Sequence, residues 1–116
     1  MRLLHTALVF LILTPAIAQD PASAQQKAAR ETRERMQLIS TRAFGNFRAA
    51  ESVEYRLQQE GMTLHPQLIA LRARVESALD DARDDLQAGR IKEANETLDR
   101  AQAWLDRFAH RMGGGY

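Results

Sequence analysis

The stretch from residue 91 to residue 112, IKEANETLDRAQAWLDRFAHRM, decides the fold. Its apolar side chains recur in steps of three and four, at Ile91, Ala94, Leu98, Ala101, Leu105, Phe108 and Met112. Such steps place every member on one face of an α-helix, in the pattern of a packed helical seam. The stretch therefore predicts an amphipathic helix over about residues 90–112 that buries its apolar face against other helices.

Two more apolar stripes with helical spacing precede this one. The first comprises Met36, Ile39, Ala43, Phe47, Ala50, Val53 and Leu57, and the second Leu68, Leu71, Val75, Ala78 and Ala82. They predict helices over about residues 21–60 and 65–88, with Gly89 as a left-handed cap before the third helix. No stretch alternates as a strand would. The sequence predicts an all-α domain over residues 19–112, with a flexible tail at 113–116.

Short connections make the last two helices antiparallel neighbours, which pack as a hairpin on the second half of the long first helix. Residues 89–101, GRIKEANETLDRA, carry a further pattern of a turn glycine followed by alternating small and large side chains: Gly89, Ile91, Ala94, Leu98 and Ala101. This pattern resembles the second half of a tetratricopeptide repeat. A generic helical hairpin has the same packing needs, and the resemblance implies a hairpin of the kind used in protein–protein interaction.

The N-terminus predicts export. Met1 and Arg2 are followed by an apolar run over residues 3–13 and by an Ala-x-Ala site at 16–18, the arrangement of a Sec-type signal peptide. A spanning helix needs about 20 apolar residues, so an uncleaved anchor is the weaker alternative. We expect cleavage after Ala18 and a periplasmic protein, or else a secreted one, with no transmembrane segment after cleavage.

Composition excludes several classes of function. Cleavage removes one of the 16 basic residues and leaves 15 basic and 15 acidic side chains, so the mature chain lacks the basic surplus of a nucleic-acid binder. Cysteine is absent, which excludes disulfides, thiol catalysis and thiolate metal sites.

Charge is unevenly distributed along the chain. Residues 27–48 are mainly basic and residues 76–99 mainly acidic, so the two segments either face each other in the bundle or a dimer, or leave the basic one free for an acidic partner or membrane surface. The hairpin is too short to cover the whole first helix, and we expect it to reach only from about Met36 onward. Residues 25–35, here called the basic arm, are polar on all sides, so they either fray or are held by a partner or by a homodimer through the first helix. Gly45 and Asn46 mark where that helix could break.

Two groups of polar side chains are weak candidates for a metal site. One is the acidic cluster Asp80, Asp81, Asp84 and Asp85, for which a solvated face or a contact with the basic arm is the alternative. The other is the pair His65 and His110, which an antiparallel hairpin brings to the same end of the bundle. Helix-terminal histidines are common, and a positive charge near a helix C-terminus is the simpler role for His110.

Three aromatic side chains lie beside the predicted seams: Phe44, Tyr55 and Trp104. They suit packing at the bundle edge, a dimer contact or anchoring of a partner. Together with Arg30, Arg33 and Arg35 of the basic arm, they are the candidate interaction residues.

No catalytic constellation is present. The outline of one long and two shorter helices is similar to that of the helical chorismate mutases, some of which are exported. That resemblance would imply an arginine followed about eleven residues later by a lysine, whereas Arg33, Arg42 and Arg48 lead to Phe44, Val53 and Gln59. We expect that the protein is not an enzyme and that it binds no cofactor. The sequence predicts an exported protein that acts by protein–protein contact; the alternative is a small envelope-stress chaperone or metal-buffering protein.

Overall fold

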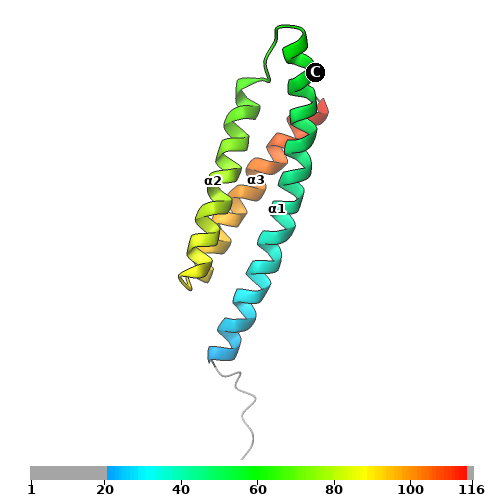
Figure 1. Ribbon diagram of the computed structural model, residues 1–116. Coiled ribbons are helices and arrows are strands. Elements are labelled where there is room, and N and C mark those ends of the chain that lie inside the picture. Colours follow the sequence, from blue (N-terminus) through cyan, green and yellow to red (C-terminus); the bar gives the residue numbers. More distant parts are fainter. Residues whose placement is uncertain (1–20, 115–116) are drawn as a thin grey trace, which may run out of the picture.

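A computed structural model describes residues 21–114 as three helices: α1 (Pro21–Gln59), α2 (Pro66–Gln87) and α3 (Ile91–Gly114) (Figure 1). The described residues contain no strand, and the all-α prediction is confirmed. The predicted signal peptide at 1–18 and the last two residues of the predicted tail lie outside the described residues. Gly113 and Gly114, expected in that tail, instead continue α3.

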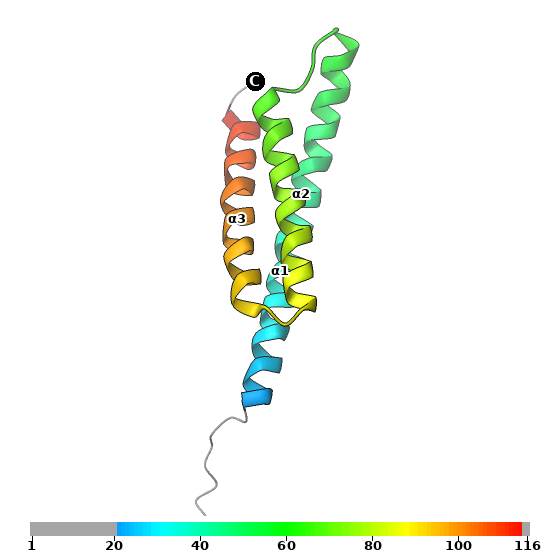
Figure 2. The ribbon, with the colours of Figure 1, turned by 90° about the vertical axis from the view of Figure 1, so that its left-hand side faces the viewer.

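The helices α2 and α3 form an antiparallel hairpin, and α1 lies along it (Figure 2). The turn between them is a Schellman motif: the Gly89 amide donates to the Leu86 carbonyl at 3.1 Å and the Arg90 amide to the Asp85 carbonyl at 2.8 Å. Gly89 has a φ of +78°, which confirms its predicted left-handed conformation. This tight turn brings the start of α2 beside the end of α3.

The connection from α1 to α2 is also fixed by local chemistry. Gly61 has a φ of +74° and ends α1 in the same motif, with the Met62 amide donating to the Leu57 carbonyl. His65 is the N-cap of α2, and its Nδ1 accepts a hydrogen bond from the Gln67 amide at 3.1 Å. Pro66 occupies the first turn, where its missing amide hydrogen has no cost. Leu64, between these caps, is buried and ties the connection to the core.

The core follows the three predicted stripes. One buried cluster lies mid-bundle and contains Ile39, Ala43, Val75, Leu79, Ala82, Leu98 and Leu105. The second lies nearer the α1–α2 connection and contains Ala50, Leu64, Leu68, Leu71 and Phe108. Phe47 and Phe108 meet edge to face, with ring centroids 5.2 Å apart, and so join α1 to the hairpin.

The helix α1 is continuous through Gly45 and Asn46, where the sequence allowed a break. A Cβ added at Gly45 would meet nothing within 4 Å, so packing within the chain does not require a glycine there.

Packing of α1 on the hairpin begins earlier than Met36, through polar contacts that the apolar pattern does not contain. Thr32 is only 4% exposed, and its hydroxyl oxygen accepts a hydrogen bond from the Asn95 side-chain amide at 2.8 Å. Arg35 donates to the Asn95 side-chain oxygen at 3.1 Å and forms an ion pair with Asp99. The C-terminal part of the basic arm is therefore held by α3 of the same chain. The first turns of α1 project past the Gly89 turn (Figures 1 and 2).

Candidate functional site

Two of the three predicted aromatic anchors are exposed on α1. Phe44 is 65% and Tyr55 66% exposed, and eleven residues, about three helical turns, separate them on one side of the helix. Arg48 lies between them, with its guanidinium carbon 5.6 Å from the centroid of the Phe44 ring. This geometry is that of a cation–π contact between two exposed side chains of α1.

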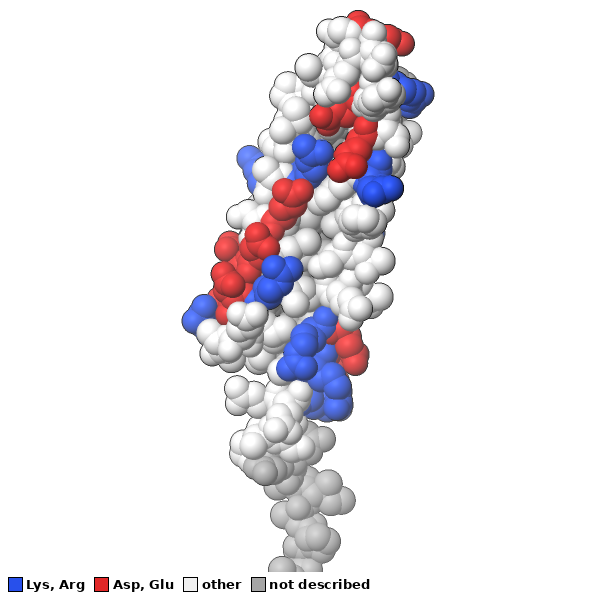
Figure 3. Space-filling model, in the orientation of Figure 1, with Lys and Arg blue, Asp and Glu red and all other residues white. Residues whose placement is uncertain are grey.

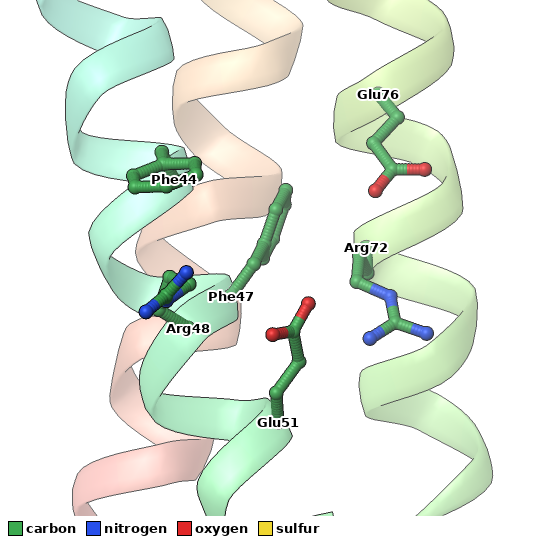
Figure 4. Close-up of a pocket in the computed structure, with 6 residues that line it drawn as sticks. All are labelled: Phe44, Phe47, Arg48, Glu51, Arg72 and Glu76. Atoms are coloured by element: carbon green, nitrogen blue, oxygen red, sulfur yellow. The ribbon is translucent and has the colours of Figure 1, made fainter.

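A groove runs beside these residues, between α1 and α2 (Figure 4). Its cavity has a volume of about 320 Å³, and its lining combines two aromatic rings, two guanidinium groups and two carboxylates: Phe44, Phe47, Arg48, Glu51, Arg72 and Glu76. In Figure 4, Glu51 of α1 and Glu76 of α2 both point into the gap between the helices. The groove thus offers an apolar wall and charges of both signs.

A second, shallower hollow continues along α1 from the same residues. Arg48 and Glu51 line both hollows, and Ser52, Tyr55 and Arg56 complete the second one. We call the combined surface, formed by the residues that line the two hollows, the α1 face. It suits a partner that contributes apolar side chains and both donors and acceptors of hydrogen bonds.

The three arginines of the basic arm differ in their surroundings. Arg35 is engaged with Asn95, Asp99 and Gln102 on α3. Arg30 and Arg33 are exposed, and no carboxylate of the described residues lies within ion-pair distance of either. Figure 3 shows basic side chains gathered at this end of α1, apart from the acidic side chains that follow α2. Only the first two arginines are therefore available to a partner without breaking a contact within the bundle.

The third predicted aromatic, Trp104, is half-buried and packs against both core clusters. It also lines a hollow of about 140 Å³ between α2 and α3, which includes Arg74 and Asp81. Trp104 therefore contributes to the bundle interior and lies on a different surface from Phe44 and Tyr55.

Two of the four carboxylates of the acidic cluster form ion pairs within the hairpin. Asp80 pairs with Arg83 at 3.1 Å and Asp85 with Arg90 at 2.8 Å, whereas the one ion pair between the basic arm and the described hairpin joins Arg35 to Asp99 of α3. His65 is occupied as an N-cap, and His110 is exposed on α3. Among the described residues, no three histidine or acidic side chains lie together in a group that could hold a metal ion.

Sequence reasoning missed several surface residues. Arg72 and Glu76 of α2 complete the groove, and a pattern search centred on apolar stripes passes over them. The sequence analysis also did not identify three arginines that line a groove between α2 and α3: Arg74, Arg107 and Arg111. Their signal was the i,i+4 pair Arg107 and Arg111 on α3, together with the antiparallel register that places Arg74 opposite.

Neither a protein-family model, nor a curated protein, nor a solved structure matches the chain. Within residues 21–114, no helix combines the length and apolar character that crossing a membrane requires.

Proposed function

We propose that this is an exported, non-enzymatic interaction protein whose α1 face binds another envelope or secreted protein. The observation that carries the proposal is the exposure of Phe44 and Tyr55 on one side of α1, next to a groove of about 320 Å³. Large aromatic side chains beside a partly apolar groove are typical anchors of protein interfaces. Export rests on the signal-peptide pattern of residues 1–18.

A helical segment of the partner fits this surface best. An amphipathic helix laid along a groove contributes apolar side chains every three or four residues. Phe44 and Tyr55, about three turns apart on one side of α1, can contact two such side chains of a partner helix. Glu51 and Glu76 offer acceptors to basic side chains of the partner, and Arg48 offers a donor. Arg30 and Arg33 extend the contact to an acidic region of the same partner.

The test is capture of partners from crosslinked envelope extract by the mature protein, tagged at its C-terminus. The wild-type protein should recover one dominant partner, and the double variant Phe44→Ala/Tyr55→Ala should lose it. Leu38→Ala is the matched control, because Leu38 is an apolar side chain on α1 that is 73% exposed but lines neither hollow. Equal recovery by the double variant would refute the α1 face. Export is tested separately, by mass spectrometry of the mature N-terminus, which should be Gln19.

A small envelope-stress chaperone is the second candidate. The observation that favours it is that exposed large apolar side chains also occur outside the α1 face, at Leu38, Met62 and Ile69. A chaperone would recover many unrelated unfolded proteins, and Leu38→Ala would weaken this recovery as much as the double variant does. The breadth of the captured set and the response of the control thus distinguish the two functions.

A further inference from the structure

Four charged side chains of α3 have two different neighbours. Asp99 and Asp106 form ion pairs with Arg35 and Arg42 of α1. Arg107, directly after Asp106, lines a groove on the α2 side of the helix, together with Arg111 one turn later. Two aspartates of α3 thus bind α1, whereas two arginines of the same helix line the groove with α2.

This α2/α3 groove has a volume of about 290 Å³. Its charged lining comes from both helices, with Arg74 on α2 and with Arg107 and Arg111 on α3. Gln67 adds a side-chain amide, and Ala70 and Leu71 form an apolar wall. The start of α2 and the end of α3 meet here because the hairpin is antiparallel, so Arg74 joins two arginines of α3 that are more than 30 residues away in sequence.

Within the described residues, the three arginines of this groove have no acidic partner. Among residues 21–113, no carboxylate lies within ion-pair distance of Arg74, Arg107 or Arg111, and no hydrogen bond occupies their guanidinium groups. Of the other described arginines, five pair with carboxylates and five do not, so what distinguishes these three is that they line one cavity. Three like charges around one cavity repel each other, and a bound anion would remove that repulsion.

We propose that the α2/α3 groove binds a phosphate group through Arg74, Arg107 and Arg111. Guanidinium groups present pairs of N–H donors that match phosphate oxygens in bidentate geometry. Three such groups and the Gln67 amide offer more donors than a single carboxylate can accept, and a phosphate has more oxygens to accept them. The site is independent of the α1 face, with which it shares no residue.

The phosphate can be a free ion or part of a lipid headgroup, and two probes distinguish these sources. The first is a titration of the mature, isotope-labelled protein with inorganic phosphate at low ionic strength, followed by backbone amide chemical shifts. The second is cosedimentation with vesicles containing phosphatidylglycerol, compared with vesicles of phosphatidylcholine alone. Low salt is needed because screening weakens contacts between exposed charges.

Two double variants with the same loss of charge test the site. Arg107→Gln/Arg111→Gln removes two of its guanidinium groups, and Arg30→Gln/Arg33→Gln removes two exposed ones from α1. We expect saturable shifts of the amides around residues 67–74 and 107–111, with affinity for phosphate reduced at least tenfold in the first variant and less than twofold in the second. Unfolding midpoints close to that of the wild type will show that both variants fold.

Each outcome decides the proposal. Phosphate binding that requires Arg107 and Arg111, without vesicle binding, supports the site and assigns it a soluble phosphate. Binding to phosphatidylglycerol vesicles that requires the same residues supports it and assigns it a lipid headgroup. Failure to bind either probe overturns the proposal, and so does an equal loss in the Arg30→Gln/Arg33→Gln variant, which would indicate only a general effect of charge.

Discussion

The hydrogen bond between Thr32 and Asn95 should be a principal attachment of the first half of α1 to the hairpin. It joins a buried hydroxyl on α1 to a side-chain amide on α3 at 2.8 Å, outside both apolar clusters. A double-mutant cycle with Thr32→Val and Asn95→Ala isolates this contact, because valine keeps the shape of threonine without its hydroxyl. Such cycles separate a pairwise energy from the other effects of each substitution.

The structure sets the expected magnitudes. Thr32→Val removes one buried hydrogen bond, worth about 1 kcal/mol. Asn95→Ala removes the bonds to Thr32, to the Ile91 carbonyl and from Arg35, about 3 kcal/mol in all, and regains about 0.6 kcal/mol of helix propensity. Arg35 keeps its contacts with Asp99 and Gln102, which lowers the net loss to about 2 kcal/mol. The double variant should lose about 1 kcal/mol less than the sum of the single losses.

Urea denaturation of residues 19–116 measures all four corners of the cycle. Glu96→Ala serves as the control, since Glu96 is exposed beside Asn95 and forms no ion pair with the described residues; its effect should stay within about 0.5 kcal/mol. A coupling energy within about 0.3 kcal/mol of zero would refute the reasoning. In that case Thr32 and Asn95 would not interact in solution, and only the contacts of Arg35 with α3 would attach the basic arm to the hairpin.

Four single substitutions test the core, the open surface of α1 and two glycines. Phe108→Ala empties a fully buried position against Phe47 and should cost about 3–5 kcal/mol in urea denaturation, whereas Phe44→Ala should stay within about 0.5 kcal/mol; equal losses would contradict the assigned core. Gly89→Ala places a side chain at a φ of +78° and should lower the free energy of unfolding by about 1–2 kcal/mol. The melting temperature should fall, and an unchanged melting temperature would contradict the left-handed conformation of this turn. Gly45→Ala should raise the unfolding free energy by about 1 kcal/mol, and a loss would show that the helix or its surroundings need the glycine.

Most of the fold follows from the spacing of apolar side chains. The stripe from Ile91 to Phe108 is buried or half-buried throughout, and Gly89 adopts the conformation that its position predicts. The extent of α1 packing did not follow, because Thr32 is not apolar and its burial depends on a side-chain amide 63 residues away. The spacing of apolar residues shows which side chains share one face of a helix. It does not show which polar groups of two different helices form a hydrogen bond.

The candidate site was predictable only in part. Phe44, Tyr55 and Trp104 all lie beside a seam, yet only the first two are exposed, since the width of the buried face depends on how closely the helices approach. Arg33 and Arg35 cannot be distinguished in the sequence, because both are arginines in the same polar stretch. In the structure, α3 provides hydrogen-bond acceptors for Arg35 and not for Arg33. The arginines of the α2/α3 groove form a cluster only after the hairpin has closed, so no local pattern contains all three.

Gly45 links stability to the proposed function. A glycine inside a helix costs about 1 kcal/mol relative to alanine, and neither packing nor backbone conformation requires one here. It lies next to Phe44 on an exposed part of α1, where a missing side chain lets a partner helix approach the backbone closely. Gly45→Ala should therefore stabilise the free protein and weaken partner capture. Opposite effects on stability and on binding are expected of a residue whose role is in the interface. If the variant is more stable and captures the partner as well as the wild type does, Gly45 is not part of the interface. The stability that this glycine costs the helix would then have no functional explanation.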